Sequence, residues 1–144
     1  EYLTHFALWA IMGSPLIMGC DLRKASEETK KTLLNKDLIA INQDLEARGA
    51  YVIKPLPDVY NENEAFILVK PLADGDLAIG IFNFSDTQRE LSLEFWDMGI
   101  PYAAGLSLSL HDCITGEELG EFTERFAPVV PSHGCVVVRA HLAE

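Results

Sequence analysis

The feature that most constrains the fold of this chain is a change in hydrophobic period near Gly49. Before this glycine, apolar residues recur at helical spacing. After it, short runs alternate between apolar and polar residues, with turn residues between the runs. The two patterns bury their apolar side chains in different ways, so we divide the chain into a helical part, residues 1–48, and a strand-rich part, residues 49–144.

The helical part begins with an apolar segment. Residues 1–12 are apolar nearly all round, so a helix there is expected to be buried on most faces. Residues 13–15, Gly-Ser-Pro, end this helix. The run 16–18 that follows is typical of a short strand buried on both faces, as in a parallel sheet. Because no capping residue precedes the first helix, the chain reads as if cut from a longer protein.

A second helical stretch is expected over residues 26–42. Ser26 is a suitable N-cap, because its hydroxyl can accept a hydrogen bond from an unpaired backbone N–H. Glu27 and Lys31 stand four residues apart and are expected to form an ion pair. A helix, a buried strand and further helices form a fragment of α/β architecture.

The pattern of the strand-rich part predicts an antiparallel sandwich whose strands have one face exposed to solvent. We expect this sandwich to pack against the helical part. Its clearest alternation places Leu91, Leu93 and Phe95 on one face and polar residues on the other. The expected strands cover residues 51–56, 65–70, 77–84, 89–95, 106–110, 120–126 and 135–140.

Composition excludes several partners. Asp and Glu number 22 against 11 Lys and Arg, so the formal charge is −11. This charge repels phosphate backbones and anionic lipids, and we expect neither a nucleic-acid nor a membrane partner. No apolar run approaches the roughly 18–20 residues that span a bilayer. Any signal peptide would lie before Glu1, so the cellular compartment stays open.

The cysteines and histidines show no metal-ligand spacing, and we expect neither a metal nor a cofactor. Cys20, Cys113 and Cys135 are expected to be free thiols, with a Cys113–Cys135 bridge as the alternative. His5 lies on the apolar helix and is expected to be an interior histidine.

Candidate acid–base and sugar-binding groups are also present. Carboxylates occur in neighbouring pairs, which solvated turns explain better than catalysis does: Glu27/Glu28, Glu62/Glu64, Asp74/Asp76 and Glu117/Glu118. Trp9 and Trp96 are expected in the core rather than as platforms for a sugar. Asn83-Phe84-Ser85 fits a glycosylation acceptor, a triplet that is common by chance. These patterns by themselves name no reaction.

Two long motifs add a resemblance. Residues 4–23, THFALWAIMGSPLIMGCDLR, and 34–44, LNKDLIAINQD, closely resemble segments of glycoside hydrolase family 27, the α-galactosidases or melibiases. The stretches HDCITGEELGEF and VVPSHGCVVVRA are similar to the closing strands of that family's C-terminal sandwich.

The resemblance implies a (β/α)8 barrel followed by an antiparallel β-sandwich. A whole barrel needs about 250 residues, so only its tail fits in residues 1–48. On this basis residues 15–18 would be the eighth barrel strand, and residues 26–42 the closing helices.

The family's reaction is retaining hydrolysis of terminal α-linked galactose by two aspartates. Both are expected before Glu1, so no residue here is assigned as catalytic. Asp21, which follows the expected eighth strand, is the one candidate for a substrate-binding or supporting carboxylate, although a structural ion pair with Arg23 that closes the barrel is the favoured explanation.

We therefore expect a structural fragment that is inactive alone. Two alternatives stay open. The fragment could be a carbohydrate-binding or interaction module that self-associates through the exposed barrel remnant. The parent could instead act on α-N-acetylgalactosaminides or β-L-arabinopyranosides.

Overall fold

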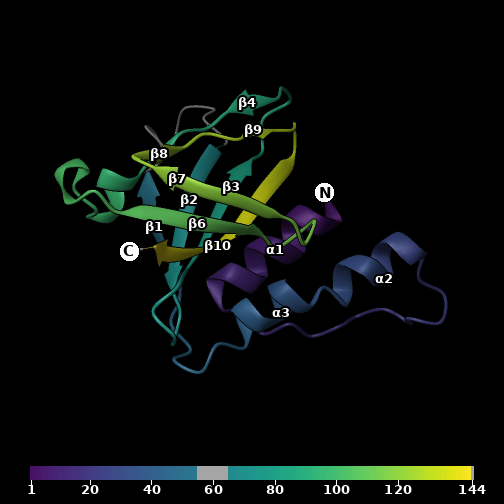
Figure 1. Ribbon diagram of the computed structural model, residues 1–144. Coiled ribbons are helices and arrows are strands. Elements are labelled where there is room, and N and C mark those ends of the chain that lie inside the picture. The colour runs from purple at the N-terminus through teal and green to yellow at the C-terminus, as the bar shows by residue number, and fades with distance from the viewer. Residues whose placement is uncertain (55–64, 144) are drawn as a thin grey trace.

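The computed structural model describes residues 1–54 and 65–143. Its centre is a six-stranded antiparallel sheet with strand order β1-β2-β3-β10-β6-β7, called the main sheet below. The strands are β1 (Tyr51–Lys54), β2 (Ala65–Pro71), β3 (Leu77–Asn83), β6 (Ser107–Asp112), β7 (Glu118–Thr123) and β10 (Gly134–Ala143). Figure 1 shows the helices gathered on one side of this sheet and the short strands on the other.

Short strands cover the inner face of the main sheet. They form two pairs, β4 (Arg89–Glu90) with β9 (Val129–Val130), and β5 (Leu93–Glu94) with β8 (Arg125–Phe126). Two 3₁₀ turns follow β5, at Phe95–Met98 (η1) and Tyr102–Ala104 (η2). Apolar side chains of both layers form the sandwich core, including Ile67, Val69, Ile79, Ile81, Leu93, Phe95, Leu108, Leu110, Phe126 and Val138.

The strand expected over residues 89–95 is divided into β4 and β5, because Leu91 N instead bonds the Pro128 carbonyl and the chain turns at Phe95. The predicted inward face is nevertheless confirmed. Leu93 and Phe95 are buried, and Leu91 packs against the same core. Of the strand expected over 51–56, residues 55 and 56 lie outside the described part.

Helices α1 (Tyr2–Met12) and α3 (Lys36–Asn42) cover the outer face. The central strands are consequently buried on both faces, and the expectation of one wet face is wrong there. The contact is close at Gly80 of β3, where an added Cβ would stand 2.6 Å from Phe82 Cε2 and 2.9 Å from Ile11 Cδ1. A glycine is needed at this position because α1 approaches the strand directly.

Polar contacts fix the helices to the sheet. Lys70 is fully buried, and its ammonium donates a hydrogen bond to the Ile41 carbonyl in the last turn of α3. Burial lowers the pKa of Lys70, and the nearby Asp44 carboxylate opposes that shift. Asn35 Nδ2 donates to the Cys113 carbonyl at 2.8 Å. Hydrogen bonds as well as apolar contacts therefore hold the helices against the sheet.

The second helical stretch consists of α2 (Glu27–Leu33) followed by α3. Ser26 is the N-cap of α2 and accepts from Thr29 N at 3.1 Å, as expected. Glu27 pairs with Lys30 rather than with Lys31, at 2.7 Å, because the i,i+3 neighbour is also within reach on a helix.

The strand expected over residues 15–18 is absent from the described chain. This segment has no regular secondary structure, and the backbone bond from Ile17 N to the Pro15 carbonyl is local. A strand requires a partner for its backbone groups, and no other described strand lies beside it.

Candidate functional site

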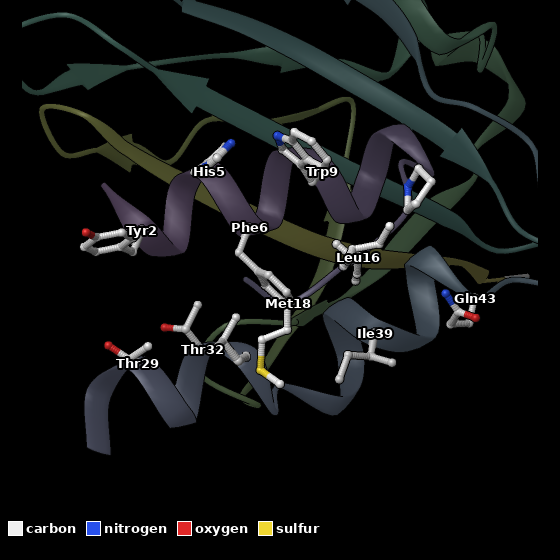
Figure 2. Close-up of a pocket in the computed structure, with 13 residues that line it drawn as sticks. Tyr2, His5, Phe6, Trp9, Leu16, Met18, Thr29, Thr32, Ile39 and Gln43 are labelled. Carbon is white, nitrogen blue, oxygen red and sulfur yellow. The ribbon is translucent and has the colours of Figure 1, made fainter. Parts of the chain in front are cut away.

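A groove of 460 Å³ lies between α1, the segment 15–18 and the pair α2–α3. Figure 2 shows α1 along one side and α2 with α3 along the other. Its lining is Tyr2, His5, Phe6, Trp9, Pro15, Leu16, Ile17, Met18, Thr29, Thr32, Leu33, Ile39 and Gln43.

The groove is an apolar surface. Ile17 is 88% exposed and Tyr2 84%, although both are large hydrophobic residues. In Figure 2 the Phe6 side chain points from α1 toward α2 and α3, and Met18 lies between these two walls of the groove. Among its described lining residues there is no carboxylate, so the groove has the composition of a packing surface rather than of an acid–base site.

The first helix is less buried than its composition predicted. Of its residues, only Thr4, Ala7, Ala10 and Ile11 are buried. His5 is exposed, which corrects the expectation of an interior histidine, and its ring meets Trp9 edge-on with centroids 5.5 Å apart. The apolar residues outside the sheet contact therefore face the groove or solvent.

Asp21 lies at the surface beyond this groove. Its carboxylate accepts two hydrogen bonds from the Arg23 guanidinium, at 2.9 and 3.0 Å, and one from Arg23 N at 3.1 Å. These bonds lower the pKa of Asp21, with the side-chain bonds contributing most. The ion pair expected between these residues is thus present.

Most of the acidic pairs are held in other contacts. Arg139 binds both Asp74 and Asp76, and Asp76 also bonds His141 at 2.6 Å. Glu118 bonds His111, while Glu62 and Glu64 lie outside the described residues. A retaining glycosidase needs two carboxyl groups about 5–5.5 Å apart across a sugar. The groove has none, and the smaller cavity beside Tyr102 has one, Glu124.

The three cysteines are free thiols, so the alternative of a Cys113–Cys135 bridge is not realised. Burial raises the pKa of Cys113 to about 12 and that of Cys135 to about 11. Neither thiol is therefore suited to nucleophilic chemistry. Among the described residues no group of three or more His, Cys, Asp or Glu side chains could hold a metal ion. No helix in the described ranges is long and apolar enough to cross a membrane.

Both tryptophans are exposed rather than in the core as expected, and the exposed fraction of Trp9 is 43%. Trp96 is 61% exposed rather than in the core, because the η1 turn sends its neighbour Phe95 inward instead. The alternation of apolar and polar residues ends at Phe95, and this was the sequence signal that the strand does not continue through Trp96. Asn83 is fully buried and donates to the carbonyls of Thr87, Val130 and Pro131, so its amide is not accessible as a glycosylation acceptor.

Comparison with known proteins identifies both parts of the chain. Residues 1–44 match the family model described as alpha galactosidase A, and residues 62–140 match the alpha galactosidase C-terminal beta sandwich domain.

Individual relatives agree. A Dictyostelium discoideum protein named "Probable alpha-galactosidase" is 36% identical over 96% of this chain, and alpha-galactosidase A of Cellvibrio japonicus is 34% identical over 96%. This chain covers 35% of each. The crystal structure of a GH27 β-L-arabinopyranosidase variant from Geobacillus stearothermophilus, in complex with arabinose, superposes with a TM-score of 0.83 at 25% identity. That match covers 99% of this chain and 30% of the other.

The chain thus spans about a third of the length of the curated relatives it matches. Its helices correspond to a barrel remnant and its sheets to the C-terminal sandwich, as the resemblance implied. The chain belongs to glycoside hydrolase family 27, the α-galactosidase family, and corresponds to its C-terminal portion.

Proposed function

We propose that this chain is the closing part of a retaining α-galactosidase that hydrolyses terminal α-linked galactose. The observation that carries the proposal is the pair of family matches, which together cover both the helical and the strand-rich part. On this proposal residues 1–48 complete a barrel and residues 49–144 form the sandwich that supports it.

In this proposal the groove is the surface through which residues 1–48 contact the rest of the barrel. Its apolar lining supplies the surface on which further barrel segments would pack, and such burial contributes about 25 cal/mol per Å² of apolar area. The segment 15–18 has no strand partner in the described chain and would gain the backbone partners of a barrel strand there. The contribution of this chain is then to hold the barrel closed.

The two catalytic aspartates of this proposal lie in barrel segments before Glu1. We propose no catalytic residue within the described chain. The test is hydrolysis of a chromogenic α-galactoside by the 144-residue chain and by the longest polypeptide that its coding region specifies. The longer protein should be active and the short chain inactive. Specific turnover by the short chain would contradict the proposal.

Asp21 has a narrower proposed role. Catalytic faces of such barrels lie at the carboxyl ends of the strands, and Asp21 follows segment 15–18 directly. We propose Asp21 as a substrate-binding or supporting carboxylate near the sugar, with the Arg23 ion pair holding its orientation. Asp21→Asn in the longer protein should raise KM or lower kcat. An unchanged kcat and KM would reduce Asp21 to a structural ion pair.

A different substrate within the family is a second candidate. It is favoured by the similarity to the Geobacillus arabinopyranosidase structure. Chromogenic α-galactoside, β-L-arabinopyranoside and α-N-acetylgalactosaminide compared by kcat/KM on the longer protein would decide among the three. We expect the α-galactoside to give the highest value.

Self-association is the main alternative role for the isolated chain. The exposed side chains of Trp9, Ile17 and Met18 would be covered by a second copy if no barrel segments are present. Light scattering of the 144-residue chain tests this. A concentration-dependent increase in mass is expected for an uncovered packing surface, whereas a monomer at all concentrations would count against it.

A further inference from the structure

The C-terminal end of α1 is held by a side chain from another helix. Asn42, the last residue of α3, is buried, and its Nδ2 donates to the Ser14 carbonyl at 2.8 Å. The same nitrogen lies 3.5 Å from the carbonyl oxygens of Trp9 and Ala10 in the last turn of α1. We call Asn42 and these three carbonyls the α1 clamp. The clamp joins α3 to the residue that leads into segment 15–18.

The amide of Asn42 has a fixed orientation. Gln43 Nε2 donates to Asn42 Oδ1 at 2.6 Å, which assigns the amide oxygen and directs the amide nitrogen toward α1. Figure 2 shows Gln43 at the end of the groove opposite Tyr2, where α1 ends. The donor of the α1 clamp is therefore held in place before any further segment packs against the groove.

The backbone turn that ends α1 involves the same carbonyls. Gly13 N donates to the Ala10 carbonyl at 3.2 Å, and Gly13 has a φ of 72°. Ser14 N donates to the Trp9 carbonyl at 3.1 Å. This is a common geometry for a helix end at which the chain changes direction. Because Asn42 bonds carbonyls on both sides of the glycine, it fixes the direction in which the chain leaves the helix.

The sandwich in turn fixes the position of Asn42. Its neighbour Ile41 accepts a hydrogen bond from the buried ammonium of Lys70 on β2. Beyond α3, Asp44 Oδ2 accepts from Ala73 N at 3.0 Å. The chain is thus bound to the sandwich on both sides of Asn42, so the location of the α1 clamp depends on the sandwich.

The segment that leaves the α1 clamp is weakly packed. Residues 17–21 are exposed, and Asp21 forms its ion pair with Arg23, two residues away. The position of Asp21 therefore depends on where the chain leaves α1. We propose that Asn42 is a positioning residue, which transmits the location of the sandwich through Ser14 and segment 15–18 to Asp21. This inference rests on the proposed function and adds a residue to the reaction of the longer protein.

The test compares two variants of Asn42 with a matched control. Asn42→Ala removes the amide, while Asn42→Asp keeps the size of the side chain but its carboxylate cannot donate. Asn35→Ala is the control, because Asn35 is also an amide beside α3 and bonds the Cys113 carbonyl and Leu38 N. Thermal unfolding of the three variants sets an assay temperature at which each is folded.

Hydrogen exchange of the 144-residue chain measures the α1 clamp directly. The amides of Gly13 and Ser14 are bonded in the turn. Both Asn42 variants should exchange about tenfold faster in a peptide that contains this turn, which corresponds to the loss of one hydrogen bond. Asn35→Ala should leave the peptide unchanged. Unchanged exchange in both Asn42 variants overturns the proposal. Failure of both to fold would assign Asn42 to overall stability and also overturn it.

Kinetics of the longer protein with a chromogenic α-galactoside measure the positioning. Both Asn42 variants should change the same constant, KM or kcat, that Asp21→Asn changes, by about fivefold, and Asn35→Ala should leave both constants within about twofold. Because Asn42 acts through Asp21, Asn42→Ala combined with Asp21→Asn should be no worse than the more damaging single variant.

Independent, additive effects of the two substitutions overturn the proposal, as does an unchanged kcat and KM in the Asn42 variants. In either case the unmodified longer protein stays active. An unmodified longer protein without hydrolysis would instead overturn the proposed function, and this inference with it, so the two failures are distinguishable.

Discussion

The main sheet is covered on one face by the short strands β4, β5, β8 and β9, and on the other by α1 and α3. The strand layer places polar residues such as Glu90 and Arg125 on its outer side, where both are exposed. The helix layer instead turns apolar residues outward, with Ile17 and Met18 more than half exposed. The strand layer therefore mixes exposed polar residues with exposed apolar ones such as Val129, while the helix layer borders a mainly apolar groove suited to a further neighbour.

The largest effect on stability is expected in the core between the main sheet and the strand layer. Phe95→Ala removes a fully buried ring from the sandwich core and should lower the free energy of unfolding by about 3–5 kcal/mol. Urea denaturation followed by circular dichroism measures this. Trp96→Ala is the adjacent control, and being exposed it should cost less than about 1 kcal/mol. Similar losses for the two variants would contradict the separation of core and surface in η1.

The contact between the helix layer and the sheet is tested at Gly80. A methyl group there would overlap Phe82 and Ile11, so Gly80→Ala should lower the free energy of unfolding by about 1–3 kcal/mol. Gly19→Ala is the control, because no atom lies within 4 Å of a Cβ at that position. Denaturation midpoints of the two variants should differ clearly. A neutral Gly80→Ala would show that α1 is held less closely than described.

A smaller, pH-dependent effect is expected at His111, which joins the two parts of the chain. Its Nε2 lies 3.1 Å from Asp37 of α3 and its Nδ1 lies 2.7 Å from Glu118 of β7, while Arg139 of β10 is its cross-strand neighbour. Hydrogen bonding to Asp37 and then to Glu118 raises the pKa of His111. The folded state therefore holds this proton more tightly than the unfolded state does.

This stabilisation is complete below the unfolded-state pKa of about 6.5 and disappears as the pH rises through the folded-state value. His111→Gln should cost up to about 1 kcal/mol in the acidic range and close to nothing in the alkaline range. Denaturation curves across pH measure the difference. Asp37→Asn should flatten the same pH dependence, and an effect of His111→Gln that is constant with pH would contradict the ion-pair explanation.

The smallest effect on stability is expected on the outward surface of the helix layer. Ile17→Ser with Met18→Ser should change the free energy of unfolding by less than about 0.5 kcal/mol, because both side chains are already largely exposed. Self-association measured by light scattering should nevertheless decrease. A large loss of stability would mean that this segment is packed within the chain, and the contrast between the layers would fail.

Local sequence signals predicted several of these features directly. Ser26 was placed as a cap because its hydroxyl acts within one turn, and Leu93 and Phe95 were placed inward because alternation fixes the face of a strand. Trp96 was missed because β5 ends at Glu94 and Trp96 lies in the η1 turn that follows. Asn83 was missed as a buried hydrogen-bond centre because its acceptors, the carbonyls of Val130 and Pro131, are far away in the sequence.

The amino-acid sequence by itself determined the change from helices to strands near Gly49, the antiparallel character of the second part and the family. These depend on local spacing and on motifs that are continuous in the chain. Only the tertiary structure decided that α1 covers the second face of the main sheet, that Lys70 is buried under α3, and that Trp96 and Tyr102 stand exposed together. Such features depend on how distant segments pack, and no local pattern records which neighbour a side chain will meet.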